Sequence, residues 1–185
     1  MRTLLALVFG SLIATTALAA NPDETWREAR LRPQDARLAD LLRAGVARSA
    51  TFRALVNRLE SGNVIVYLSL SQTLRSNLAG KLTWMTKAGN FRYLKATLNL
   101  EQTADQMIAT LAHELQHALE VSADLDVTDQ RSMLALYKRI GRPSYSGLVE
   151  AWETQAAQDA GFRVRRELLS AATAATAILS EQSQL

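Results

Sequence analysis

Apolar residues at intervals of three and four predict two helices in the first third of the chain. Leu38, Leu41 and Leu42 lie on one face of the first helix. A second period of the same kind follows Gly45 and stops at Gly62. Glycine is common where helices end, so these two residues delimit the second helix.

The periodicity then changes to that of strands. Residues 63–70 (NVIVYLSL) are rich in β-branched and aromatic side chains, which is typical of a largely buried strand. Residues 81–87 alternate between apolar and polar side chains, and a turn at 88–90 returns the chain into residues 91–98, as in a hairpin. The pattern therefore predicts a small sheet of three to four strands.

Helical periods return in the second half of the chain. Thr103 is placed to cap a helix that runs to about Val121, and a shorter helix over 129–140 is expected to end at Gly141. A third helix is expected over residues 147–169. Helices that are grouped around a small sheet indicate an α+β fold.

The two ends of the chain have their own predictions. Residues 1–19 combine Arg2, an apolar stretch and a small-x-small sequence, which is typical of a cleavable signal peptide. We interpret residues 20–33 as a polar N-terminal lead-in, residues 34–169 as the domain, and residues 170–185 as a C-terminal tail that frays or docks loosely. The protein is therefore expected in the periplasm or outside the cell, with no stable membrane insertion after cleavage.

Composition excludes several kinds of site. With no cysteine among 185 residues, the chain cannot form disulfides, thiolate zinc sites, iron–sulfur clusters or a cysteine nucleophile. Any metal must therefore bind to nitrogen and oxygen. A net charge of +3 with 6% aromatic residues does not indicate a nucleic-acid partner. Histidine is the informative count, because the chain has two and they stand four residues apart.

Residues 113–117 read His-Glu-Leu-Gln-His and lie within the predicted helix that Thr103 caps. Residues four apart share a helix face, with Cβ atoms about 5 to 6 Å apart, so His113 and His117 can direct ring nitrogens at one ion. Glu114 lies one step round the helix, where a carboxylate can act as a general base without being a ligand. Chance placement of these three residues has odds under about one in a thousand.

This HExxH segment resembles the active-site helix of the zinc metallopeptidases. Catalytic zinc usually takes three protein ligands and keeps one position for water. The elongated motif, with glycine three and histidine six residues after the second histidine, does not fit, because Glu120 and Ala123 stand there. The third ligand must then be a carboxylate, as in the glutamate-zincins, the thermolysin-like type. The resemblance implies a minimal zincin-like domain with one zinc ion (Zn²⁺) and a second helix that carries the glutamate ligand.

Glu153 is the predicted third ligand. It shares a predicted helix face with small residues, among them Ala157 and Gly161, and small side chains allow a second helix to approach the first closely. Glu150, one turn earlier, is the alternative, and solvated carboxylates are the ordinary explanation for both. Many glutamate-zincins carry aspartate four residues after the ligand, where this chain has Ala157.

Spacing does not single out the remaining roles. Tyr145 is a candidate for polarising the substrate carbonyl, and a structural tyrosine explains it equally well. Glu120, Asp124 and Asp159 are candidates for orienting a ligand imidazole through its second nitrogen. The resemblance further implies that the strand at 91–98 is an edge strand that pairs with an extended peptide.

Two other clusters have simpler explanations. We expect Trp84, Phe91 and Tyr93 to pack across strands rather than to line a substrate cleft. The arginine-rich segment 163–166 is expected to be the solvated face of the last helix rather than an anion site.

The resemblance implies an exported zinc-dependent peptidase that hydrolyses peptide bonds in peptide or protein substrates. His113, His117 and Glu153 would bind the zinc ion, and Glu114 would act as the base. The alternative is a periplasmic metal-binding or interaction domain that retains the site without turnover. A helical structural module, in which the HELQH segment is incidental, is the third hypothesis.

Overall fold

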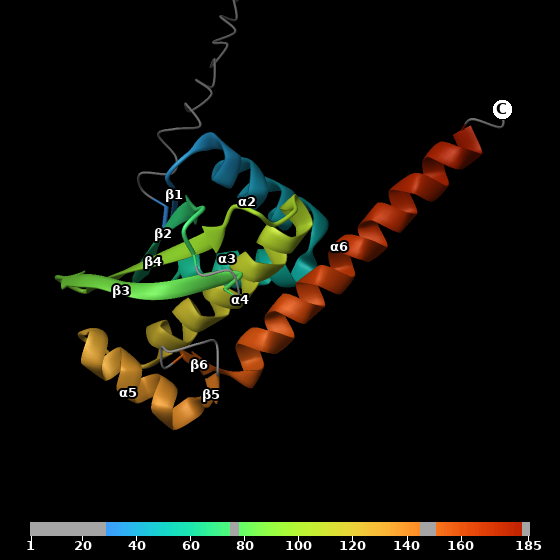
Figure 1. Ribbon diagram of the computed structural model, residues 1–185. Coiled ribbons are helices and arrows are strands. Elements are labelled where there is room, and N and C mark those ends of the chain that lie inside the picture. Colours follow the sequence, from blue (N-terminus) through green and yellow to red (C-terminus); the bar gives the residue numbers. More distant parts are fainter. Residues whose placement is uncertain (1–28, 75–77, 145–150, 183–185) are drawn as a thin grey trace, which may run out of the picture.

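Five helices and a small four-stranded sheet, with a separate two-stranded pairing, make up the described part of the chain (Figure 1). The computed structural model describes residues 29–74, 78–144 and 151–182, with side chains described as far as residue 173. In chain order the elements are β1 (Leu31–Pro33), α2 (Ala36–Arg48), α3 (Ala50–Glu60), β2 (Val64–Ser71), β3 (Gly80–Ala88), β4 (Phe91–Asn99), α4 (Ala104–Ala123), α5 (Gln130–Ile140), β5 (Arg142–Ser144), β6 (Ala151–Glu153) and α6 (Gln155–Gln182). The fold is α+β, as predicted.

The four-stranded sheet is mixed and has the strand order β1-β2-β4-β3. Strand β2 runs parallel to both of its neighbours, whereas β3 pairs antiparallel with β4. The turn between β3 and β4 contains Gly89 with a φ of 56°, a left-handed conformation that glycine adopts without strain. The predicted strand at 63–70 and the predicted hairpin are both confirmed.

Strand β4 lies inside the sheet, although its segment was expected at an edge. It pairs with β2 on one side and with β3 on the other, so its backbone groups are already hydrogen-bonded. The chain passes from β2 to the far edge of the sheet, forms β3 there, and returns between them as β4. The prediction that residues 91–98 offer a free edge is therefore wrong, and β3 takes that position.

Helix α4 is the centre of the packing. It contacts β2, β3 and β4 on the sheet side and also contacts α2, α3 and α6. Thr103 caps it as predicted and forms a capping box with Gln106. The predicted apolar face is completely buried at Met107, Ile108, Leu111, Leu115 and Ala118. The histidines therefore project from a helix that neighbours hold from several directions.

Arg92 closes the other end of α4. This side chain of β4 is 3% exposed, and its guanidinium donates hydrogen bonds to the carbonyl oxygens of Val121, Ser122 and Asp124 at 2.5 to 3.0 Å. The last carbonyls of a helix have no partner within the helix, so these bonds satisfy them. A fourth hydrogen bond from the same guanidinium goes to Oδ1 of Asn63. No pattern in the sequence predicts this role for an arginine in a strand.

Helix α6 differs from the predicted third helix at both ends. It begins at Gln155 rather than near Gly147, and it continues to Gln182 rather than to about Leu169. The tail predicted to fray is therefore helical to that residue, and in Figure 1 this end projects from the rest of the molecule. Alanine-rich sequence has high helix propensity, which explains why the helix persists there.

The small face predicted for the last helix does pack against α4. Ala157 and Ala160 are buried, and a Cβ atom at Gly161 would lie 3.3 Å from the carbonyl oxygen of Ala109. The two helix backbones therefore lie close together, as small side chains allow. This part of the prediction is confirmed.

The end of the predicted lead-in is a packed element. Leu31 is completely buried and pairs with Val66 of β2, so the prediction of an unpacked segment is wrong for β1. Residues 1–28, with the predicted signal peptide, lie outside the described residues. In the part of the chain that the structure describes, no helix is both long enough and apolar enough to cross a membrane.

Candidate metal centre

His113 and His117 face each other from adjacent turns of α4. Their Nε2 atoms are 3.2 Å apart, and the two rings meet edge to face with centroids 4.8 Å apart. His117 is buried and His113 is partly buried. The predicted pairing of the two rings on one helix face is confirmed.

Glu153 brings a carboxylate to the same point from a segment distant in the sequence. Its Oε2 atom lies 2.9 Å from Nε2 of His113 and 4.0 Å from Nε2 of His117. Among the described residues, these three side chains form the group whose potential ligand atoms all lie within 4.8 Å of one another.

Glu153 does not lie on a helix, contrary to the prediction. It is the last residue of β6, which pairs antiparallel with β5, and the following residue, Thr154, precedes α6. A Cβ atom at Gly141 would lie 3.0 Å from the carbonyl oxygen of Glu153, so glycine allows the end of α5 to pass close to β6. A short strand and a tight crossing, rather than a helix face, therefore place the carboxylate.

The hydrogen bonds of the site assign its protons. Nδ1 of His117 faces the carboxylate of Glu120 at 2.9 Å, so Nδ1 carries the proton and Nε2 presents a lone pair. The hydrogen bond between the two Nε2 atoms must then be donated by His113. Oε2 of Glu153, which is buried, then has no hydrogen bond among the described residues, and its contact with Nε2 of His113 at 2.9 Å is one of charge.

These three atoms fit a tetrahedral zinc ion. In such a site, with bonds of about 2.0 to 2.1 Å, neighbouring ligand atoms lie about 3.3 Å apart. The observed distances of 2.9, 3.2 and 4.0 Å bracket that value. A buried carboxylate oxygen without a partner is costly, and a cation between the rings would satisfy it. Imidazole and carboxylate are ligands that suit zinc.

Charge interactions shift the pKa values of two of these groups in opposite directions. Burial lowers the pKa of His113, but its short polar contact with Glu153 and the charges of Glu114, Glu153 and Glu120 outweigh burial, so the pKa is raised. Burial raises the pKa of Glu153, but the contact with His113 and the charges of both histidines outweigh it, so that pKa is lowered. Without a metal, the two groups therefore favour a charged pair.

Glu114, the predicted base, is buried beside the histidines. Burial raises its pKa, while the charges of His117 and His113 lower it and that of Glu153 raises it, and the net shift is upward. A Cβ atom at Gly80 would lie 3.0 Å from Oε1 of Glu114. Glycine at the start of β3 therefore leaves room for this carboxylate. A raised pKa in a cluster of titratable groups is typical of a functional site.

Of the three residues predicted to orient a histidine ring, one contacts a histidine in the structure. Glu120 contacts the ring of His117, whereas Asp124 pairs with Arg139 and Asp159 accepts a hydrogen bond from Gln155 on the exposed side of α6. Ala157, where an orienting aspartate was considered, is buried and has no polar group to offer.

Sequence reasoning missed two residues that hold His117 and Glu153 in place. Tyr137 of α5 donates a 2.9 Å hydrogen bond to the backbone oxygen of His117, and its ring meets that imidazole edge to face. Thr154 accepts a hydrogen bond from the backbone N–H of Ala157, as an N-cap residue does. A threonine directly before an alanine-rich run is a helix-start signal, and it places the start of α6 after Glu153.

Other predicted residues have simpler outcomes. Tyr145 and Glu150 lie outside the described residues. Trp84 packs partly buried against the core, and the Phe91 ring lies under the guanidinium of Arg30 at 4.4 Å rather than against another described aromatic ring. The arginines of segment 163–166 are exposed, as predicted for a solvated helix face.

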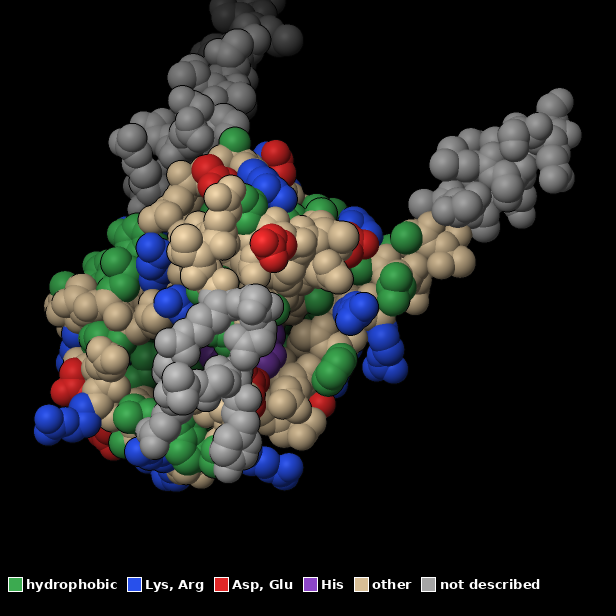
Figure 2. All heavy atoms as spheres, viewed as in Figure 1, with side chains coloured by type: hydrophobic (Ala, Val, Ile, Leu, Met, Phe, Trp, Pro, Cys, Tyr) green, Lys and Arg blue, Asp and Glu red, His purple; other side chains and the backbone are tan. Residues whose placement is uncertain are grey.

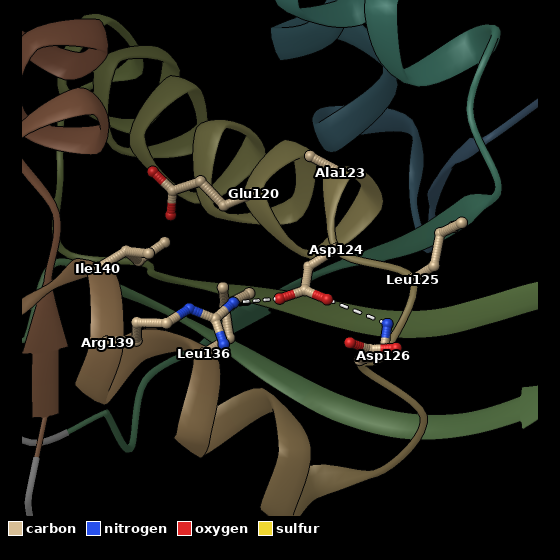
Figure 3. A pocket seen from close by; sticks show the side chains of 8 residues that line it. All are labelled: Glu120, Ala123, Asp124, Leu125, Asp126, Leu136, Arg139 and Ile140. Carbon is tan, nitrogen blue, oxygen red and sulfur yellow. Dashed lines mark hydrogen bonds and ion pairs between the residues drawn. The ribbon is translucent and has the colours of Figure 1, made fainter.

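An open hollow of about 430 Å³ lies between the end of α4 and α5 (Figure 3). Its lining residues are Glu120, Ala123, Asp124, Leu125, Asp126, Leu136, Arg139 and Ile140. Of these, Glu120 contacts a histidine of the centre, so the hollow adjoins the outer side of the centre rather than its ligand atoms. Histidine surface is visible on the face drawn in Figure 2, and 20% of the His113 side chain is exposed, so the centre reaches solvent at His113.

Comparisons of this chain with protein-family models, with curated proteins and with solved structures give no match. No family is therefore shown for the chain.

Proposed function

We propose that the protein is an exported zinc-dependent peptidase of minimal glutamate-zincin type. The observation that carries the proposal is the convergence of His113, His117 and Glu153 beside the buried carboxylate of Glu114. Two imidazoles and a carboxylate are a ligand set of catalytic zinc sites, which keep a further position for water.

Zinc held by these three side chains would supply a Lewis acid that acidifies a water molecule and polarises a carbonyl. Glu114 accepts a proton from the attacking water as the new C–O bond forms, and it returns that proton to the nitrogen as the peptide C–N bond breaks. Because burial raises the pKa of Glu114, this group is better suited to exchange protons near neutral pH than an exposed glutamate.

The edge strand β3 supports an extended peptide as the substrate. Gly80 begins this strand beside Glu114, and β3 also contacts α4. An extended peptide that adds to the outer edge of β3 would form main-chain hydrogen bonds there. Its backbone would then run close to the proposed base.

The variant Glu114→Gln tests the proposal. The amide keeps the size of the side chain but cannot accept the proton, so we expect hydrolysis of a fluorogenic peptide library to fall by about 10²- to 10⁴-fold. Zinc content, measured by atomic emission after metal-free purification and zinc reconstitution, should stay at one ion per chain.

Glu101→Gln is the matched control, because Glu101 is exposed and lies outside the centre. It should keep both zinc and turnover. Turnover of Glu114→Gln that equals wild type would contradict the role of Glu114. A wild-type protein that binds zinc but cleaves no peptide would favour the metal-binding alternative, and one that binds no zinc would favour the structural module.

A further inference from the structure

We propose that Glu120 is a positioning residue. Its hydrogen bonds to His117 and Thr154 join helix α4, which carries the two histidines, to the segment that carries Glu153. The inference deepens the proposed function and rests on the same metal centre. Oε2 of Glu120 lies 2.9 Å from Nδ1 of His117, and its Oε1 accepts a 2.6 Å hydrogen bond from the hydroxyl of Thr154. One carboxylate therefore contacts both α4 and the segment that carries Glu153.

On the α4 side, Glu120 determines which nitrogen of His117 faces the metal. A carboxylate only accepts hydrogen bonds, so Nδ1 must donate and the neutral ring presents its lone pair at Nε2. That atom is the one that faces His113 and Glu153. A carboxylate on the second nitrogen also makes an imidazole a stronger ligand.

On the other side, Glu120 holds the junction between β6 and α6. The Thr154 hydroxyl donates to Glu120 and accepts from the N–H of Ala157, so both of its hydrogen-bonding functions are used. Thr154 is 4% exposed and directly follows Glu153. Fixing Thr154 therefore limits the positions that the neighbouring ligand can reach before any metal binds.

The surroundings leave Glu120 available for this role. Among the residues that line the same hollow, the basic side chain is Arg139, and it forms its ion pair with Asp124. In Figure 3 the Glu120 carboxylate points away from that pair. Its side chain is 10% exposed, so water competes little for its two hydrogen bonds.

The first test compares zinc affinity. The amide of Glu120→Gln is uncharged and carries an NH₂ donor in place of one of the two accepting oxygens, so the two oxygen positions can no longer both accept, one from His117 and the other from Thr154. We expect this variant to bind zinc about 10- to 100-fold more weakly, measured by competition with a chromophoric chelator. Glu101→Gln, which removes an exposed charge, should bind zinc as wild type does.

The second test concerns the link to Thr154. Thr154→Val keeps the side-chain shape but removes the hydroxyl, so we expect zinc affinity to fall by about tenfold. Thr154→Ser keeps the hydroxyl and should restore wild-type affinity. Because the two residues act as one unit, the double variant of Glu120→Gln and Thr154→Val should lose little more affinity than Glu120→Gln alone.

A third measurement separates positioning from simple stabilisation. The chain has two histidines, so the ¹⁵N signals of the zinc-free protein can be assigned directly. We expect His117 to carry its proton on Nδ1 in the wild type, and Glu120→Gln to shift that proton toward Nε2. A role confined to fold stability would lower the midpoint of thermal unfolding and leave the proton where it is.

The outcomes separate this inference from the proposed function. Unchanged zinc affinity and an unchanged proton position in Glu120→Gln would overturn the role of Glu120, even if the wild type cleaves peptides. Losses in zinc affinity that simply add in the double variant would overturn the coupling through Thr154. A wild type that binds zinc but cleaves nothing would remove the peptidase proposal alone. A wild type that binds no zinc would overturn both.

Discussion

The two halves of the candidate centre hold their side chains in different ways. On α4, the helical repeat alone brings His113 and His117 onto one face, and the capping box and the buried apolar face keep the helix in place. Glu153 instead ends a three-residue strand whose position depends on β5 and on the crossing at Gly141. The placement of two candidate ligands can thus be a local property of the chain, whereas the placement of the third depends on the tertiary structure.

The largest expected effect is the loss of a ligand from either half. Glu153→Ala and His117→Ala should each lower zinc affinity by about 10²- to 10³-fold, because each removes one of the three metal contacts. Chelator competition measures both values. Equal losses would show that the two halves contribute alike. Wild-type affinity in Glu153→Ala would show that the carboxylate is not a ligand.

The next largest effect concerns the stability of α4, the helix that carries the two histidines, because Arg92 of β4 binds the end of this helix. Arg92→Met should reduce the free energy of unfolding by about 2 to 4 kcal/mol, because it removes charged hydrogen bonds and leaves buried carbonyl groups without a partner. Urea unfolding measures the change. Arg58→Met, at an exposed position, is the control and should have little effect. Equal unfolding midpoints for the two variants would mean that α4 needs no such support.

The affinity for zinc should depend on pH, because protons and zinc compete for His113. Because the pKa of His113 is raised above about 6.5, protons compete with zinc from a higher pH than for an exposed histidine. Zinc affinity should therefore fall by up to about tenfold per pH unit as the pH drops below that pKa. An affinity that is constant between pH 8 and pH 6, by chelator competition, would contradict the predicted proton competition.

The stability of the zinc-free protein should depend on pH in the opposite direction to zinc affinity, and it should fall as the pH rises through the pKa of His113. The raised pKa of His113 contributes stability below about 6.5 that is lost as the pH rises through the raised value. The lowered pKa of Glu153 contributes stability above about 4.5 that is lost as the pH falls through the lowered value. Thermal unfolding of the zinc-free protein should therefore show the full contribution of this pair between about pH 4.5 and 6.5.

The smallest expected effect is purely local. Thr103→Ala removes the cap of α4 and should lower the free energy of unfolding by about 1 kcal/mol. Zinc affinity of the folded protein should stay at the wild-type value, because the cap lies more than two turns before His113. Urea unfolding and chelator competition measure the two effects. A large loss of zinc affinity would mean that the start of α4 also controls the ligands.

Much of the fold follows from local patterns. The helices near α2, α3 and α5, the strand β2 and the hairpin of β3 and β4 were all expected from periodicity and turn residues. The strand β1 and the pairing of β5 with β6 were not, because each has three residues and too little sequence to show a period. The edge position of β3 was missed for another reason, since strand order depends on which strands pair across the sheet.

The spacing of His113, Glu114 and His117 determined half of the centre by itself, because side chains on one helix are placed by the backbone repeat. A carboxylate in the third place was expected from the absence of other ligands, and Glu153 was preferred to Glu150 because of small residues on a predicted helix face, although Glu153 lies in β6 and not on that helix. Only the tertiary structure decided that this glutamate ends a strand, that Thr154 and Glu120 link it to His117, and that Arg92 closes α4. Those contacts join segments far apart in the chain, and no local pattern of residues encodes a distance across the fold.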